Sequence, residues 1–294
     1  MGREEVSRPC RQSKVLALRC LQASVCWERG ENPNLGAALS SRSDTCEALR
    51  IVSGDPVALV VGAGPGLGGA LSRRFGREGF QVAAVRRRHG DELDQLCGEI
   101  EGAGGRALGF EVDARREEEV VALFDRVEAE MGPLEIVVFN PGANINIPIR
   151  DMPARKFFKV WEMACFAGFL VGREAARVMV PRARGTLFFT GATASLRGGP
   201  GFSAFASAKA GLRAVAQSMA RELGPEGIHV AHTVIDGPID MPFIRENFGE
   251  ALAGRGPDAL LAPDDIAQTY WAIHQQPRSA WTFEVDLRPW VEKW

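Results

Sequence analysis

The 294-residue sequence lacks any apolar run of about 20 residues, the length that a membrane-spanning helix requires. Its 35 basic and 37 acidic side chains give a formal net charge of −2, so it lacks the positive excess typical of nucleic-acid or anionic-membrane binding. The four cysteines of the first fifty residues form no C-x-x-C pair and have no histidine nearby. We therefore expect no nucleic-acid or membrane partner, no metal site, and free thiols.

Residues 1–53 lack a sustained apolar pattern and mix arginines with glutamates and loop-like stretches. A disordered extension of a cytoplasmic protein is one interpretation of this segment. An arginine- and serine-containing leader to a mitochondrion or plastid is the other, although the early glutamates weaken it. The whole chain has the composition of an ordinary globular protein, 46% apolar and 24% charged, and we expect one domain in residues 54–294.

The most informative stretch runs from Val57 to Phe75. An aliphatic run leads into a glycine-dense turn and then into a segment with helical periodicity. Glycines let a backbone approach a phosphate closely, and the N-terminus of a helix attracts anions. Gly62, Gly66 and Gly68 have the spacing G-x-x-x-G-x-G, which predicts a nucleotide-binding loop.

Strand-like and helix-like segments alternate along the rest of the chain, which indicates parallel βαβ units. The fold class that we predict is α/β, a single doubly wound Rossmann-type domain with a mostly parallel seven-stranded sheet. The expected strands are residues 57–61, 81–85, 107–111, 135–139, 186–190, 229–235 and 283–286.

Several motifs follow this loop in register: Asp113, Asn140-Pro-Gly-Ala, Thr190-Gly-Ala-Thr and a helix carrying Lys209. Together they resemble the short-chain dehydrogenase/reductase family over about residues 55–290. The resemblance implies an NAD(P)-dependent oxidoreductase that acts on a carbonyl or alcohol of a small-molecule substrate. It also implies a homodimer or homotetramer, to which the alanine-rich helix from Ala204 to Leu223 is suited.

The resemblance assigns binding roles residue by residue. Gly62, Gly66 and Gly68 are expected to form the pyrophosphate loop, and Asp113 to meet the adenine amino group. Asn140 and Gly142 are expected to form the turn under the adenine ribose. Lys209 is expected to bind the nicotinamide ribose, and the backbone of Ile239 the nicotinamide carboxamide. Asp236 departs from the proline that the family has before this last segment.

The end of the second expected strand determines the choice of cofactor. An acidic residue there would bind the ribose 2′-hydroxyl of NAD, whereas arginine pairs with the 2′-phosphate of NADP. Arg86 and Arg87 occupy this place, and no carboxylate follows until Asp91. Because guanidinium groups match phosphate geometry, we expect NADP, with NAD still possible.

The catalytic motif departs from the family. The family's tyrosine, four residues before its lysine, corresponds to Phe205, which has no exchangeable proton, while Lys209 is retained. The family's serine falls on Ala192 and its asparagine on Cys165, and the sole tyrosine, Tyr270, lies far along the chain.

Thr193 and Cys165 are candidate substitutes near the expected reaction centre. Thr193 could polarise a carbonyl or satisfy a turn, and Cys165 could act as a weak acid or pack as a small apolar residue. Two functions remain open: an oxidoreductase with a relocated proton donor or a water held by Lys209, and a catalytically silent dinucleotide-binding sensor or scaffold.

Overall fold

The computed structural model describes residues 54–88, 90–242, 244–246, 256 and 258–292, and the expected extension of residues 1–53 lies outside them. The described part contains a seven-stranded sheet with the order β3-β2-β1-β4-β5-β6-β7, in which every neighbouring pair is parallel. The strands are β1 (Val57–Val61), β2 (Gln81–Arg86), β3 (Arg106–Glu111), β4 (Leu134–Phe139), β5 (Gly185–Thr190), β6 (Ile228–Ile235) and β7 (Glu284–Leu287). The predicted fold class is confirmed, and the predicted strand limits differ from these by at most one residue.

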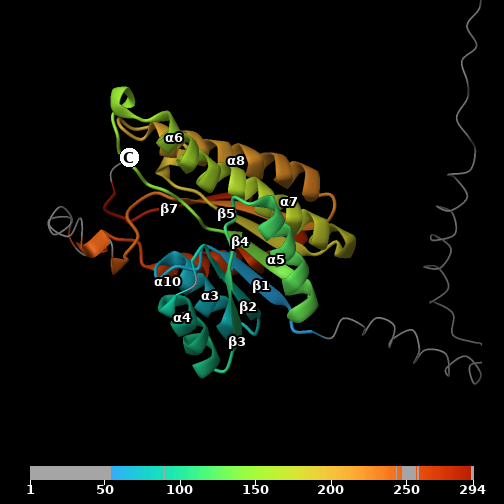
Figure 1. Cartoon of the computed structure of the whole chain (residues 1–294). Coiled ribbons are helices and arrows are strands. Elements are labelled where there is room, and N and C mark those ends of the chain that lie inside the picture. The colour runs from blue at the N-terminus through green and yellow to red at the C-terminus, as the bar shows by residue number, and fades with distance from the viewer. Residues whose placement is uncertain (1–53, 89, 243, 247–255, 257, 293–294) are drawn as a thin grey trace, which may run out of the picture. The chain divides into compact units, whose positions relative to one another are not determined.

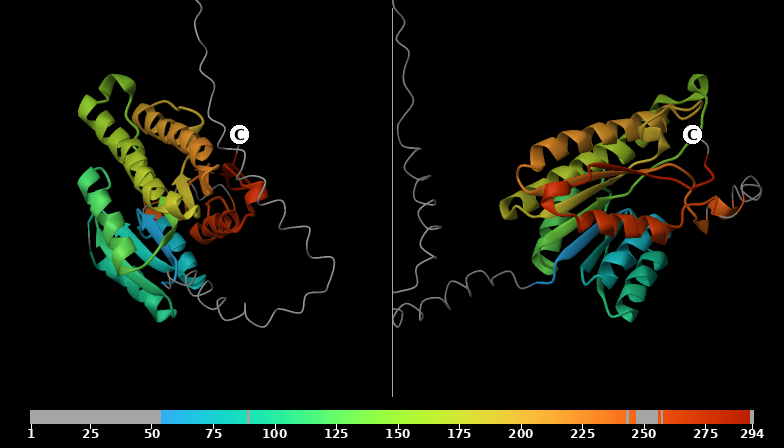
Figure 2. Two further views of the ribbon diagram at one scale, coloured as in Figure 1. Left: turned by 90° about the vertical axis from the view of Figure 1, so that its right-hand side faces the viewer. Right: turned by 180° about the vertical axis from the view of Figure 1, so that it is seen from behind.

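Helices cover both faces of the sheet (Figure 1). One layer contains α3 (Leu67–Arg77), α4 (Asp91–Gly102) and α10 (Pro263–His274). The other contains α5 (Glu117–Glu130), α6 (Ala154–Trp161), α7 (Ala167–Met179) and α8 (Ser203–Leu223). Figure 2, left, shows the sheet between these two layers. Because both faces are covered, β1 and β6 are buried along their whole length, which explains the continuous apolar sequence of β1.

The strand order reverses between β1 and β4, where the chain crosses from one side of the sheet to the other. In doubly wound sheets, ligands bind in the crevice at the carboxyl ends of the strands beside such a reversal. The turn after β1, the segment after β4 and the loop after β5 all lie at this edge. The fold therefore brings together the motifs that the sequence analysis singled out.

Helices α6 and α7 are joined by a π-helical turn, Glu162–Phe166, which continues the helix without a break. Cys165 lies in this turn and packs against α8. Single π-turns inserted in helices are frequent at functional sites.

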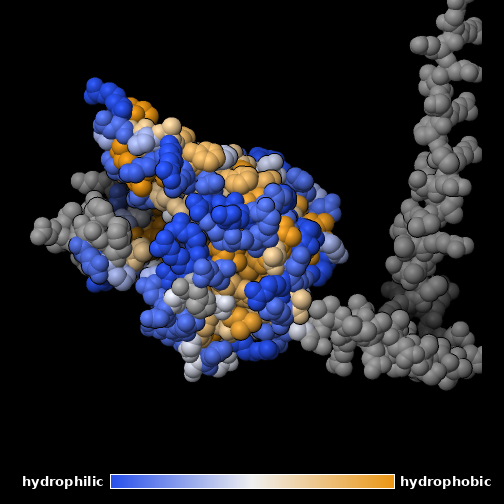
Figure 3. All heavy atoms as spheres, in the orientation of Figure 1, coloured by the Kyte–Doolittle hydropathy of each residue, from blue (hydrophilic) through white to orange (hydrophobic). Residues whose placement is uncertain are grey.

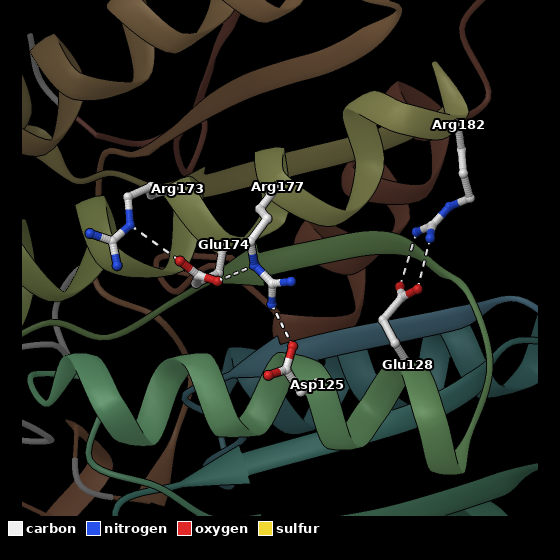
Figure 4. Close-up of polar contacts among 6 residues, drawn as sticks. All are labelled: Asp125, Glu128, Arg173, Glu174, Arg177 and Arg182. Carbon is white, nitrogen blue, oxygen red and sulfur yellow. Dashed lines mark hydrogen bonds and ion pairs between the residues drawn. The ribbon is translucent and has the colours of Figure 1, made fainter.

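Ion pairs join α5 to α7 on the side remote from the sheet (Figure 4). The buried carboxylate of Glu174 lies between Arg173 and Arg177, and Arg177 also reaches Asp125 at 2.7 Å. Arg182, just beyond α7, makes a forked contact with Glu128 of α5. These contacts fix the long helix that leads to the site.

No helix in the part of the chain that the structure describes is long and apolar enough to cross a membrane. The same residues contain no cluster of three or more histidine, cysteine, aspartate or glutamate side chains that could hold a metal ion.

Candidate functional site

Two positions of the glycine loop can be occupied only by glycine without strain. Gly62 has φ of +90°, a conformation that other residues rarely adopt. A Cβ at Gly68 would lie 2.0 Å from the carbonyl oxygen of Gly62, so only glycine lets α3 begin this close to the turn. A Cβ at Gly64, in contrast, would meet nothing within 4 Å. The loop is therefore closed on its inner side and open at Gly64, which is the shape of a cradle for a phosphate.

Gly66 lies beside a segment far along the chain. A Cβ there would lie 3.3 Å from the methyl carbon of Met241, which follows β6. The glycine loop and the segment after β6 therefore border the same space.

Asn140 links the loop to the next strand. Its side-chain amide donates to the carbonyl oxygen of Gly62 at 3.1 Å, and its backbone amide donates to Val61 at 3.0 Å. Gly142, two residues later, faces the side chain of Lys209, because a Cβ there would lie 3.5 Å from Cε of the lysine. The segment after β4 thus forms a floor between the glycine loop and α8.

Lys209 is the central charged group of the site. Its side chain is buried, and its Nζ donates to the carbonyl oxygens of Thr190 at 2.7 Å and Pro141 at 3.0 Å. Burial in surroundings of low polarity lowers the pKa of Lys209 to about 8, although the nearby Cys165 opposes this effect slightly. The ammonium therefore titrates close to neutral pH.

Phe205 precedes Lys209 by one helical turn and is partly buried. A Cβ at Gly142 would lie 3.9 Å from Cε2 of the phenylalanine and 3.6 Å from Nζ of Lys209. The ring and the ammonium therefore approach the same point, as their spacing in the sequence predicts.

Thr193 begins the short 3₁₀ turn Thr193–Ser195 that follows β5. Its hydroxyl donates to the carboxylate of Asp236, at the end of β6, and so is directed toward this buried acid. The hydroxyl of Ser195 accepts a hydrogen bond from the backbone amide of Ala192 at 3.1 Å. The Thr193 hydroxyl is thus engaged by an acid of another segment, and the Ser195 hydroxyl by the backbone of its own turn.

Cys165 packs among small side chains of α6 and α8. A Cβ at Gly211 would lie 2.8 Å from its Sγ, so the thiol is pressed against the backbone of α8. Burial raises the pKa of Cys165, and the positive charge of Lys209 lowers it to a smaller extent. The thiol is neutral near pH 7 in these surroundings.

Three other proton-bearing side chains lie on other elements, and one of them, His232, borders the site, because a Cβ at Gly191 would lie 2.4 Å from its Nε2. Tyr270 is fully buried against the opposite layer, bonds to the Thr190 hydroxyl at 2.8 Å, and has its pKa raised by burial to about 12. His232 bonds through Nδ1 to Glu284, and burial lowers its pKa to about 4. His274 bonds to Thr186 near the amino end of β5.

The end of the site that is expected to hold the ribose 2′-phosphate of NADP is strongly basic. A surface hollow of about 670 Å³ lies beyond the carboxyl ends of β2 and β3. It is lined by Arg87, Arg88, Glu111, Arg115, Lys159, Val160 and Met163. Arg86 does not line it and instead pairs with Glu92 at 2.5 Å. The sequence analysis missed Lys159, because only the fold brings α6 beside the end of β3, and it also missed Arg115, which follows Asp113 by two residues.

Asp113 already has a partner in this structure. Its carboxylate accepts from the backbone amide of Arg115 at 3.2 Å and from Nε of the same residue at 2.8 Å. This pairing lowers the pKa of Asp113, so the carboxylate is ionised. Arg115 also reaches Glu162 in the π-turn at 3.5 Å, which ties the end of β3 to the helix that carries Cys165.

Ile239 lies in a short bridge with Leu261. The backbone amide of Leu261 donates to Pro238 at 2.9 Å, and that of Asp240 donates to Leu261 at 2.9 Å. The Asp236-Gly237 turn is tightly packed, because a Cβ at Gly237 would lie 2.7 Å from Cδ of Pro289. The segment after β6 is therefore well anchored despite the replacement of the family's proline.

Comparisons with known proteins agree with this architecture. The short chain dehydrogenase family model matches residues 56–253. A crystal structure of a short-chain dehydrogenase from Rhodopseudomonas palustris is 51% identical, with a TM-score of 0.69, and the match covers 80% of this chain and 99% of that one.

Two curated relatives are also similar. The 2-dehydro-3-deoxy-D-gluconate 5-dehydrogenase of Formosa agariphila is 30% identical, and the match covers 59% of this chain and 66% of that protein. The cis-4-hydroxycyclohexanecarboxylate dehydrogenase of Sinomonas cyclohexanicum is 30% identical, and the match covers 72% of this chain and 86% of that protein. The chain belongs to the short-chain dehydrogenase/reductase family, a family of oxidoreductases.

Proposed function

We propose that this protein is an NADP-dependent oxidoreductase that interconverts a carbonyl compound and an alcohol, with Lys209 as its proton donor and acceptor. The observation that carries the proposal is the buried ammonium of Lys209, held by two backbone carbonyls at the edge where the motifs meet. Two of its three N–H groups are directed to those carbonyls, and the third can serve a ligand.

The residues present fit a dinucleotide. The loop is open at Gly64, where phosphate oxygens could approach backbone amides, and the basic hollow lies at the opposite end of the crevice. The proposed binding residues are Gly62, Gly66, Gly68, Asp113, Asn140, Gly142, Lys209 and Ile239. When bound there, a nicotinamide group would supply or remove a hydride.

The chain itself must then supply the proton. In the direction of reduction, the oxygen of the substrate gains a proton that leaves Nζ of Lys209, directly or through one water molecule. A pKa of about 8 suits this role, because a general acid works best when its pKa lies near the operating pH. Phe205 would exclude bulk water from the other side of the reaction centre.

NADP is favoured over NAD by the charge of the hollow. Among the lining residues, Arg87, Arg88 and Lys159 outnumber the carboxylate of Glu111, whereas Arg115 is already paired with Asp113 and Glu162. We expect Arg87→Gln to weaken binding of NADPH by about tenfold or more, the effect of one charge-assisted contact, and that of NADH little. Arg126→Gln is the control, because Arg126 pairs with Glu130 on the exposed side of α5. Equal affinities for both cofactors in the unmodified protein would contradict this assignment.

The pH dependence of turnover tests the role of Lys209. Reduction of a panel of ketones, quinones and aldehydes by NADPH should fall about tenfold per pH unit above pH 8, because the acid loses its proton. Lys209→Arg retains the charge but does not titrate in this range, so any residual activity should lack this decline. A decline that persists in Lys209→Arg would assign the proton to another group.

A silent dinucleotide-binding protein is the second candidate, and Phe205 is the observation that favours it. Neither the phenylalanine nor Ala192 can donate a proton, and the hydroxyl of Thr193 is engaged with Asp236. Under this alternative, NADPH binds but none of the panel is reduced at any pH.

We also propose self-association into a homodimer or homotetramer. Aromatic rings follow one another along α6 and α7, with centroids of Phe158 and Trp161 6.4 Å apart, and those of Phe166 and Phe169 6.2 Å apart. Phe158 and Phe169 are exposed, and apolar colouring extends over α7 and α8 (Figure 3). Sedimentation of the unmodified protein and of Phe158→Glu tests this proposal. We expect an oligomer for the unmodified protein and a shift toward monomer for Phe158→Glu, and an unchanged oligomer would contradict the proposed interface.

A further inference from the structure

A cluster of charged groups lies where β5, β6 and the segment after β7 meet. At its centre is Asp236, whose side chain is 4% exposed. One of its oxygens accepts from the Thr193 hydroxyl and lies 3.4 Å from Nη2 of Arg197. The other lies 3.5 Å from Nη2 of Arg288.

The cluster exposes its positive end. Arg288 is largely buried and also pairs with Asp286, so it is shared between two carboxylates. Arg197 is 51% exposed, whereas Asp236 is almost inaccessible. A ligand that approaches this edge from solvent therefore meets a guanidinium group and not the acid that holds it.

The position of Arg197 places it beside the proposed reaction centre. Its backbone amide donates to the carbonyl oxygen of Thr193 at 3.1 Å, so it belongs to the turn that follows Ala192. Asp236, which holds its guanidinium group, precedes the proposed nicotinamide contact Ile239 by three residues. Arg197 thus lies between the loop after β5 and the segment after β6.

We propose that Arg197 selects substrates that carry a carboxylate near the reacting carbonyl or alcohol. This inference rests on the proposed function and adds the class of substrate. A guanidinium group binds a carboxylate through two parallel N–H···O bonds, which makes arginine well suited to this recognition. The contact with Asp236 orients the side chain beforehand, and such preorganisation lowers the entropy that binding would otherwise cost.

A purely structural role for Arg197 makes a different prediction. If it served only to neutralise Asp236, its loss would lower the melting temperature and affect all substrates equally. Substrate pairs that differ only in charge separate the two roles. We choose 4-oxopentanoate and 4-oxo-4-phenylbutanoate, each beside its methyl ester.

The experiment measures kcat/KM with NADPH for both acids and both esters. We expect the acids to be preferred by about tenfold or more, and Arg197→Gln to bring the ratio of kcat/KM for acid and ester close to one. Arg197→Lys should restore part of it, because the charge remains without the fork. Arg221→Gln is the control, since Arg221 is an exposed arginine of α8 that bonds to the Gln217 carbonyl.

Binding is measured in parallel, through the change in NADPH fluorescence as 4-oxopentanoate is added. Acids and esters used equally, or an Arg197→Gln effect common to both, would overturn the inference and leave the proposed function standing. Failure of 4-oxopentanoate to bind the NADPH complex would also overturn it. NADPH binding without turnover of any acid or ester, but with Arg197-dependent binding of 4-oxopentanoate, would support the inference and count against the proposed reaction.

Discussion

Restoring the missing hydroxyl groups gives the sharpest test of how this site works. Phe205→Tyr would place a phenol on the side of α8 that carries Lys209, where both side chains approach Gly142. Ala192→Ser would add a hydroxyl group just after β5. The neighbouring hydroxyl groups of Thr193 and Ser195 already have hydrogen-bond partners there. We expect the double variant to reduce generic ketones faster than the unmodified protein.

The size of the gain follows from two effects. A unit charge about 4 Å from the phenol, at an effective dielectric constant of about 20, contributes about 4 kcal/mol, so Lys209 should lower the pKa of the new tyrosine. A positioned general acid typically accelerates a reaction about 10²–10⁴-fold. Since the phenol would enter a pocket shaped around phenylalanine, we expect the lower end of this range.

The assay follows NADPH oxidation with a panel of ketones at pH 7, beside thermal unfolding to confirm that each variant is folded. Phe205→Tyr alone should give part of the gain, and addition of Lys209→Ala should remove it and weaken NADPH binding. If the unmodified protein already turns over these ketones rapidly and the double variant is slower, our reasoning about Phe205 is refuted. The phenylalanine would then serve to line an apolar pocket.

Three further outcomes are expected. Gly68→Ala should lower the melting temperature sharply, because its Cβ would lie 2.0 Å from the Gly62 carbonyl, whereas Gly64→Ala should fold normally and lose affinity for NADPH measured by fluorescence titration. The free energy of unfolding should fall as the pH drops from 6.5 to about 4, because His232 is neutral in the fold and its lowered pKa makes protonation favour the unfolded chain. The loss amounts to about 3 kcal/mol at about 1.36 kcal/mol per pKa unit, and urea titrations should find a flatter profile in His232→Asn. Arg213→Met should lower the free energy of unfolding at pH 7, since Arg213 holds Glu284 with contacts of 2.6 and 2.8 Å. The same urea titrations should find a shallower fall in acid, because Arg213 lowers the pKa of both Glu284 and His232 and its loss moves them back toward their usual values.

Much of the fold could be predicted from the sequence because its signals are local. The buried strand β1 is a short aliphatic run, and the turn after Val61 needs glycine for reasons confined to a few neighbouring atoms. The i, i+4 spacing likewise placed Phe205 and Lys209 on the same side of one helix.

Contacts between distant segments could not be predicted in this way. Nothing in the residues around Thr193 indicates that its hydroxyl meets Asp236, more than forty positions later. The engagement of Asp113 by Arg115, in contrast, is local, yet it depends on a rotamer that the sequence does not specify. Lys159 reached the basic hollow only because α6 packs beside the end of β3.

The burial of Lys209 connects these observations to function. A lowering of its pKa from 10.5 to about 8 means that the fold disfavours the ammonium by about 3 kcal/mol relative to water. A methionine would fill the same volume without this cost, although it would leave the carbonyls of Thr190 and Pro141 without a donor. A ligand oxygen that accepts a hydrogen bond from Nζ would offset part of this penalty and so stabilise the ammonium form of Lys209. We therefore expect a ligand that contacts Nζ to raise the melting temperature of the protein, whether or not Phe205 permits rapid turnover.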